Sequence, residues 1–129
     1  MNKILVEVSV GELLDKISIL EIKKEKIKSS DKLKFINDEY IILKEQLKKN
    51  VQPRDAINVL FKELKEINSK LWTIEDNKRL CEKNSNFGDE FIKLSRDVHF
   101  FNDKRAKIKL EINNLTKSKI REVKEYTNY

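Results

Sequence analysis

Residues 91–115 place apolar side chains at alternating steps of three and four residues, the spacing that keeps one face of an α-helix apolar. The seam comprises Phe91, Leu94, Val98, Phe101, Arg105, Ile108, Ile112 and Leu115. Three earlier stretches repeat the spacing, and the 129 residues contain two glycines and one proline, too few for the many turns of a sheet protein. The chain is therefore expected to be all-α.

Four helices are expected, at about residues 10–28, 32–49, 54–84 and 88–116, in one domain that spans residues 1–129 and ends in a tail at 117–129. Ser9 and Glu12 have the spacing of a capping box at the start of the first helix. That helix is apolar on several faces, so we expect it at the centre. The fold predicted is an antiparallel helical bundle, a short helical hairpin packed at a shallow angle on a long one.

The two ends of the chain alternate between apolar and polar residues, as short strands do. Ile4, Val6 and Val8 form one such pattern, and residues 122–126 form the other. Because a lone strand leaves backbone groups unpaired, we expect the two segments to pair as a small ribbon. Ile120 and Val123 also suit a continuing helix, so helix remains an alternative for the tail.

Composition limits the classes of function. The net charge is +6, but most cations are lysines dispersed among glutamates, and no aromatic residues alternate with them as a nucleic-acid surface requires. Nucleic acid is therefore not the expected partner. One cysteine, no leader-like segment and no apolar run of membrane length favour a cytoplasmic protein without a membrane span.

Few residues offer recognisable chemistry. His99 stands without a second His or a Cys at ligand spacing, so no metal site is expected. No nucleophile lies near a base in a known pattern, and no glycine-rich phosphate loop is present. We expect no cofactor, and the catalytic residues of any reaction are unknown.

Arg105 interrupts the apolar seam with a permanent cation. A buried charge without a partner costs several kcal/mol, so such a position marks either an internal ion pair or a ligand site. If the long hairpin turns near residues 85–86, Arg105 shares one flank with a band of acids, amides, cations and an indole. The candidate ligand-binding residues are Asn68, Trp72, Glu75, Arg79, Asn102, Arg105 and Lys109.

Two interpretations of this band are open. In the structural one, Arg105 forms a closed pair with Glu75 or Glu21, Glu75 and Arg79 form a helical i,i+4 pair, and Trp72 belongs to the core. In the functional one, the band lines a groove for a small anionic or sugar-like ligand.

Several motifs resemble a family of small helical proteins from bacteria and their phages that is known only as a domain of unknown function. They are VSVGELLDKISILEIK at 8–23, LWTIEDNKR at 71–79, FIKLSR at 91–96, NDKRA at 102–106 and EVKEY at 122–126. The resemblance implies a cytosolic protein, encoded in some members near glycosyltransferase or surface-polysaccharide genes. It supplies no activity and no catalytic residue. Val10 departs from the pattern, which has proline before Gly11.

We therefore expect an accessory or binding module, linked to glycan or surface-polysaccharide metabolism, whose polar groove takes a small anionic ligand or a protein partner. The alternative is an enzyme acting on a phosphorylated or carboxylated metabolite, and the second alternative is a nucleic-acid-binding protein. The long hairpin should also leave an apolar stripe from Ile108 to Leu115 uncovered, which predicts a homodimer or a tail folded over the stripe.

Overall fold

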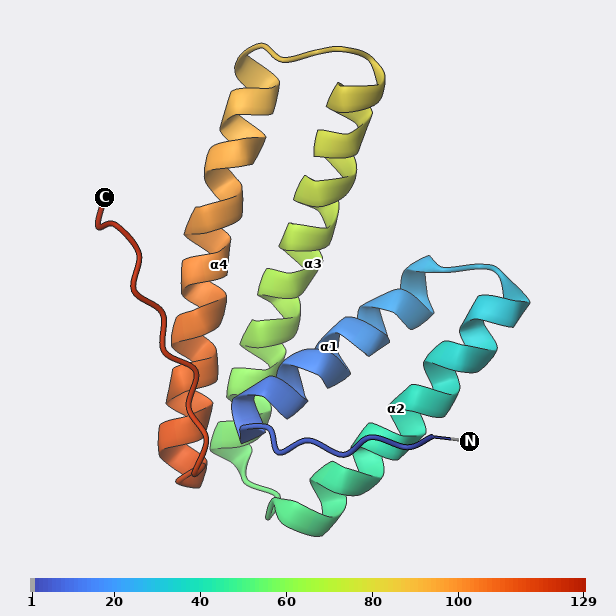
Figure 1. Cartoon of the computed structure of the whole chain (residues 1–129), viewed down its shortest axis with the longest axis vertical. Helices are drawn as coiled ribbons and strands as arrows, with labels where there is room; N and C mark the ends of the chain where they lie inside the picture. Colours follow the sequence, from blue (N-terminus) through green and yellow to red (C-terminus); the bar gives the residue numbers. More distant parts are fainter. Residues whose placement is uncertain (1) are drawn as a thin grey trace.

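The computed structural model describes residues 2–129, which form four α-helices without strands (Figure 1). The helices are α1 (Val10–Lys26), α2 (Ser30–Asn50), α3 (Asp55–Lys83) and α4 (Asp89–Thr116). The predicted all-α bundle is confirmed, and each helix begins and ends within two residues of its expected range. Within residues 2–129, none of the helices combines the length and hydropathy needed to span a bilayer.

Side chains and one backbone conformation fix the helix ends. The hydroxyl of Ser9 accepts a hydrogen bond of 3.0 Å from the amide of Glu12, and the hydroxyl of Ser29 accepts one of 3.4 Å from the amide of Lys32. Because Ser29 is the cap, α2 starts two residues earlier than expected. Lys117 adopts the left-handed conformation (φ 55°, ψ 43°), which ends α4 and turns the chain back.

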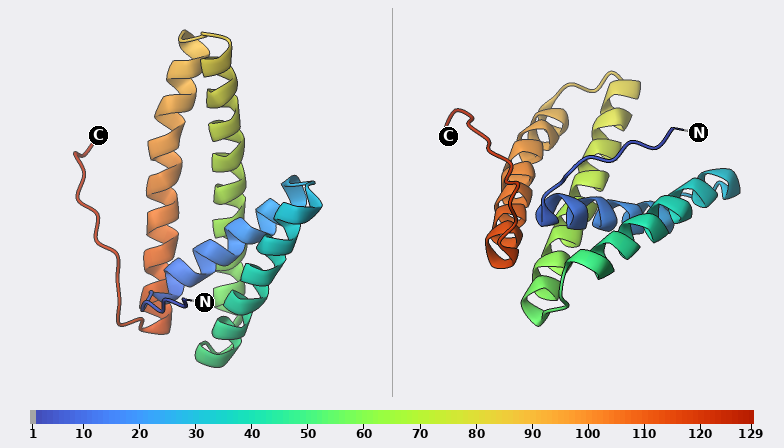
Figure 2. Two further views of the ribbon diagram at one scale, coloured as in Figure 1. Left: turned by 45° about the vertical axis from the view of Figure 1, so that its right-hand side comes forward. Right: turned by 60° about the horizontal axis from the view of Figure 1, so that its bottom comes forward.

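α3 and α4 lie side by side as a long hairpin, and α1 crosses one end of it obliquely (Figures 1 and 2). At about 1.5 Å per residue, the 29 residues of α3 extend about 43 Å, whereas the 17 residues of α1 extend about 25 Å. α1 contacts all three other helices, while α2 packs on α1. The central position of α1 agrees with the prediction made from its apolar residues on several faces. The prediction of a shallow angle between the two hairpins is wrong, because α1 crosses the long hairpin obliquely.

The main core lies where α1 crosses the open end of the long hairpin. Its buried residues come from α1, α3 and α4, namely Leu14, Ile57, Leu64, Ile108 and Ile112. Leu47 and Val51, at the end of α2, pack against the same cluster. Burial of these side chains supplies the main driving force for holding the two hairpins together.

The predicted exposed stripe from Ile108 to Leu115 is wrong. Ile112 is completely buried and Ile108 is 8% exposed, because α1 and α3 cover the end of α4 on which these residues lie. The part of the long hairpin that α1 leaves uncovered is the opposite end, near its turn (Figure 1). The stripe therefore gives no support to a homodimer, which stays a prediction.

The predicted terminal ribbon is also wrong. Residues 2–9 and 118–129 contain neither strand nor helix and run along different sides of the molecule (Figures 1 and 2). The tail instead returns beside α4, where the guanidinium of Arg121 donates a hydrogen bond of 2.7 Å to Asn114 and the hydroxyl of Tyr129 donates one to Asp103. The turn at Lys117 directs the tail along α4 and away from the N-terminal segment, so the two cannot pair.

Gly11 allows α1 to lie directly on the backbone of α4. Its amide donates a hydrogen bond of 2.7 Å to the side-chain oxygen of Asn113. A Cβ atom at this position would lie 2.6 Å from the carbonyl oxygen of Lys109 and 2.9 Å from that Asn113 oxygen. No real Cβ is found so close to a backbone oxygen, so any other residue here would push the two helices apart.

Gly11→Ala should therefore destabilise the protein, although alanine is the better helix former by about 1 kcal/mol. We expect a net loss of about 1–3 kcal/mol, the usual cost of overpacking, measured by urea denaturation. Gly88→Ala is the matched control, because a Cβ at Gly88 would meet its nearest atom at 3.6 Å, an ordinary contact distance. This substitution should change stability by less than about 1 kcal/mol. Equal effects of the two substitutions would contradict the close approach of α1 and α4.

Candidate functional site

A pocket of about 320 Å³ opens between α1, α3 and α4. Five of the candidate ligand-binding residues line it: Asn68, Trp72, Glu75, Arg79 and Arg105. Four residues that were not among the candidates complete the lining, namely Ile19, Ile22, Leu71 and Asp76. We call this the Trp72 pocket. The long hairpin supplies its polar groups, and α1 supplies an apolar wall.

The other two candidates, Asn102 and Lys109, lie outside the lining of the Trp72 pocket. Asn102 is half-buried on α4. Lys109 is buried one helical turn beyond Arg105, where it bonds to carboxylates. A ligand-binding role for the seven candidates remains a prediction.

The lining of the Trp72 pocket changes from apolar to charged toward solvent. Ile22 and Leu71 are buried at its base, and the indole of Trp72 is half-buried. Glu75, Asp76 and Arg79 are exposed at its rim. An aromatic face beside both cations and carboxylates can bind a polar ligand that has an apolar ring face and a negative group.

Arg105 enters the pocket without forming an ion pair to any carboxylate in residues 2–129. Its guanidinium donates a long hydrogen bond of 3.4 Å to the side-chain oxygen of Asn68. Glu21 is not available to it, because that carboxylate accepts hydrogen bonds from Lys65 at 3.2 Å and from Tyr40 at 3.1 Å.

Glu75 does not pair with Arg105 or with Arg79 either, so neither pair of the structural interpretation forms within residues 2–129. The guanidinium of Arg105 therefore keeps donors free for a further partner.

Asn68 joins the pocket to a buried polar network on α1. Its side-chain amide donates hydrogen bonds of 2.8 Å to the carboxylate of Asp15 and of 2.8 Å to the hydroxyl of Ser18. The Ser18 hydroxyl in turn donates a hydrogen bond of 2.7 Å to the backbone carbonyl of Asp15. All three side chains are buried, so their bonds fix the orientation of the Asn68 oxygen that faces Arg105.

Lys109 continues this network on α4. Its ammonium lies 2.7 Å from a carboxylate oxygen of Glu12, 3.0 Å from one of Glu122 and 3.9 Å from one of Asp15. Burial lowers the pKa of Lys109, but the hydrogen bonds to Glu12 and Glu122 and the negative charge of Asp15 and Glu12 outweigh it, so the pKa lies above its ordinary value. Lys109 is therefore a cation that ties α1 and the tail to α4.

Glu122 is the contribution of the tail to the network. The hydrogen bond from Lys109 lowers the pKa of the Glu122 carboxyl below its ordinary value, with a small added effect from the charge of Arg105. The carboxylate remains half exposed, so its attachment to Lys109 is open to solvent.

The network and the pocket differ in how completely their polar groups are paired. Every buried side-chain nitrogen and oxygen among residues 2–129 has a hydrogen-bond partner. Asp15 and Ser18 are paired with Asn68, and Lys109 is paired with Glu12 and Glu122, which suits a structural role. Arg105 and the rim of the Trp72 pocket have the capacity to bind something else. No group of three or more His, Cys, Asp and Glu side chains within residues 2–129 is arranged to hold a metal ion.

The sequence contained a signal for part of this network. Asp15 and Ser18 stand three residues apart on α1, the spacing that places both on one helix face. Neither residue was among the candidates, because a single acid and a single serine are common on helix surfaces. Nothing local pointed to Glu122, since its position depends on the turn at Lys117.

Lys109→Met should cost about 3–5 kcal/mol of stability, because it leaves the buried Asp15 carboxylate without a cation. Lys107→Met is the control: Lys107 is exposed on the same helix, and its replacement should change stability by about 0.5 kcal/mol or less. Both values can be obtained from urea denaturation. If the two variants had the same stability, the Lys109 cluster would not hold the fold together.

Acidification should release the tail. A carboxyl whose folded pKa is lowered contributes stability that is present above its unfolded pKa of about 4.3 and lost as pH falls through the lowered value. Residues 121–129 should therefore show raised backbone mobility in NMR relaxation below about pH 4, while the amides of α3 stay protected. Glu122→Gln should give a mobile tail already at pH 7; a tail equally ordered in that variant would exclude this attachment.

Comparisons with known proteins agree with the resemblance found in the sequence. No curated protein and no solved structure is significantly similar to the chain. A family model does match, and it covers residues 4–129, which include all four helices and the tail. The chain belongs to the Family of unknown function (DUF6165).

Proposed function

We propose that the protein is a small-anion binding module and that the Trp72 pocket is its binding site. One observation carries the proposal: Arg105, a permanent cation, lines a pocket and forms no ion pair with any carboxylate in residues 2–129. A partly buried cation that forms no direct ion pair is less favourable in the free protein than a paired one. An anionic ligand would remove that cost on binding.

The size and lining of the pocket support a particular class of ligand. A volume of about 320 Å³ lies at the lower end of the range of about 300–1,000 Å³ for ligand pockets, which suits a single sugar phosphate or a small carboxylate. The Trp72 indole can stack on a sugar ring, and Glu75 and Asp76 can accept hydrogen bonds from hydroxyl groups. Arg105 and Arg79 would bind the negative group in bidentate fashion.

The family resemblance supports a wider setting. We propose a cytoplasmic protein of bacterial or phage origin that serves glycan or surface-polysaccharide metabolism as an accessory module. A sugar phosphate or a nucleotide sugar is the kind of anion that such metabolism handles.

An enzyme acting on a phosphorylated or carboxylated metabolite remains the alternative. It is favoured by the presence of two carboxylates, Glu75 and Asp76, at the rim of the same pocket, since carboxylates can transfer protons in catalysis. Incubation of the protein with each ligand that binds, followed by phosphorus or proton NMR of the ligand, distinguishes the binding module from the enzyme. Unchanged ligand supports the binding module, and a new product supports the enzyme.

Arg105→Met should separate binding from stability. In the free protein it should leave the melting temperature unchanged or raise it, because it removes a cation that lacks an ion pair. In a thermal-shift screen of sugar phosphates, nucleotide sugars and dicarboxylates, at least one compound should raise the melting temperature of the wild type. A ligand that binds only the folded state at 100 times its Kd increases the free energy of unfolding by about 2.7 kcal/mol. That shift should disappear in Arg105→Met.

Arg96→Met is the matched control, because Arg96 is exposed on the same helix and does not line the pocket. It should keep the full ligand-induced shift. The proposal would fail if Arg105→Met kept that shift as well. It would also fail if no compound in the screen raised the melting temperature while Arg105→Met strongly destabilised the free protein, since Arg105 would then be structural.

A further inference from the structure

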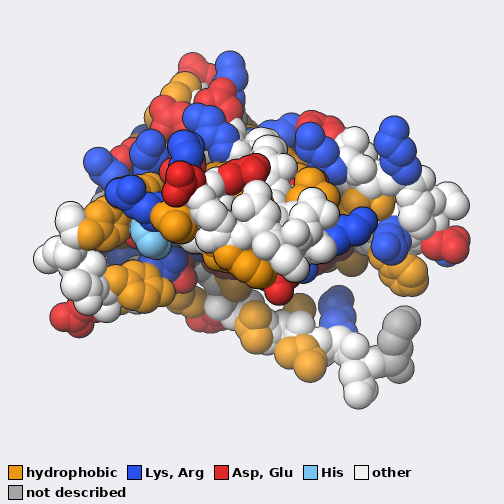
Figure 3. All heavy atoms as spheres, turned by 90° about the horizontal axis from the view of Figure 1, so that it is seen from above, with side chains coloured by type: hydrophobic (Ala, Val, Ile, Leu, Met, Phe, Trp, Pro, Cys, Tyr) orange, Lys and Arg blue, Asp and Glu red, His pale blue; other side chains and the backbone are white. Residues whose placement is uncertain are grey.

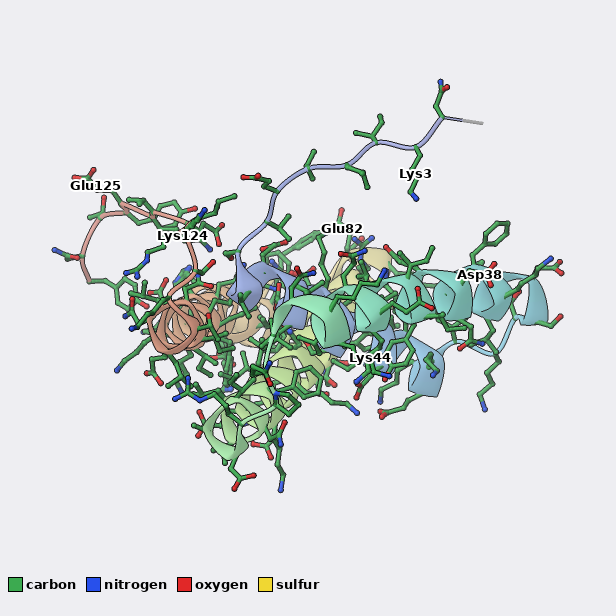
Figure 4. All side chains as sticks on the ribbon, turned by 90° about the horizontal axis from the view of Figure 1, so that it is seen from below. Lys3, Asp38, Lys44, Glu82, Lys124 and Glu125 are labelled. Carbon is green, nitrogen blue, oxygen red and sulfur yellow. The ribbon has the colours of Figure 1, made fainter. Side chains whose placement is uncertain are left out.

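The N-terminal segment before α1 exposes apolar side chains to water. Ile4, Leu5 and Val6 are 85%, 82% and 74% exposed, and Val8 is 42% exposed. We call residues 3–8 the N-terminal arm. In Figure 3 its hydrophobic side chains stand clear of the rest of the molecule, and in Figure 4 the arm, marked by Lys3, leaves the start of α1 and runs away from the helices.

The arm makes no hydrogen bond to any other part of residues 2–129. None of the hydrogen bonds within residues 2–129, apart from those inside the helices, involves residues 2–8. Ile4, Val6 and Val8 are β-branched and favour an extended backbone, in which alternate side chains point to the same side. The arm is thus a short extended segment with one apolar side and unpaired backbone groups, which is the form of a segment that binds another surface.

The same chain has an apolar groove on its surface. The groove lies between the second half of α2 and the start of α3, has a volume of about 510 Å³ and is separate from the Trp72 pocket. Its apolar lining includes Tyr40, Leu47, Val51 and Ile57, and its rim carries Lys44, Lys48 and Arg54 beside Glu45. We call it the α2–α3 groove.

We propose that the N-terminal arm of one copy of this chain binds in the α2–α3 groove of a second copy. The apolar side of the arm matches the apolar lining. Glu7 of the arm is opposite in charge to the three cations of the rim, and Lys3 is opposite in charge to Glu45.

The geometry also favours exchange between two copies. The six residues of the arm reach about 20 Å when extended, and the arm points away from its own helices. Each copy has one arm and one groove, so two reciprocal contacts close a symmetric dimer. This inference does not depend on anion binding in the Trp72 pocket.

Oligomeric state gives the first test. Light scattering of the wild type across micromolar concentrations should give a dimer, and Val6→Asp should give a folded monomer, since Val6 makes no hydrogen bond within the described chain and is mostly exposed. Val123→Asp is the control, because Val123 is 88% exposed on the tail and its replacement should leave the dimer intact. A monomeric wild type, or a dimer that survives Val6→Asp, would overturn the proposal.

Disulfide trapping gives the second test and identifies the surface that the arm contacts. Val6→Cys mixed with Asn58→Cys under mild oxidation should give a cross-linked pair, because Asn58 lines the groove. Asn86→Cys, at the turn of the long hairpin, should not cross-link to Val6→Cys. The native Cys81 is buried and stays silent in all variants. Cross-links between two Val6→Cys chains, without any to Asn58→Cys, would mean that arms pair with each other and would overturn binding in the groove.

Discussion

The buried ammonium of Lys109 is the interaction on which the arrangement of the helices depends. It connects Glu12 and Asp15 of α1 to α4 and adds Glu122 from the tail. A buried cation is tolerated where several carboxylates surround it, so the position of α1 on α4 is fixed within narrow limits. Gly11 and Asn113 act at the same crossing, where the absence of a Cβ lets the two helices approach.

The candidate site follows from that crossing. Once α1 is fixed, Ile19 and Ile22 form one wall of the Trp72 pocket, and Asp15 and Ser18 orient the amide of Asn68. Two acids of α1 are then occupied: Asp15 accepts a hydrogen bond from Asn68 and lies near Lys109, while Glu21 pairs with Lys65. Arg105 remains beside them as a cation without an ion pair among the described residues, which is the feature that makes the pocket suitable for an anion.

Local signals predicted most of the fold, and contacts between distant residues explain the rest. Apolar periodicity and the Ser9 cap are local, and the helix ranges followed from them to within two residues. The antiparallel register of the long hairpin was enough to bring five candidate residues to one pocket. The sequence could not reveal that α1 covers Ile108 and Ile112, because this depends on Gly11 meeting the backbone of α4. The alternation in residues 122–126 was misread as a strand because the position of this segment also depends on distant contacts. The turn at Lys117 brings Glu122 to Lys109.

An NMR titration tests the central claim, binding of a small anion in the Trp72 pocket, most directly. Trp72 is the single tryptophan, so its indole N–H gives one resolved signal. With a sugar phosphate, a nucleotide sugar or a dicarboxylate that raises the melting temperature, this signal and the backbone amides near Arg79 and Arg105 should shift together along one saturating curve. Saturable shifts confined to other surfaces, with the Trp72 signal unmoved, would contradict the account.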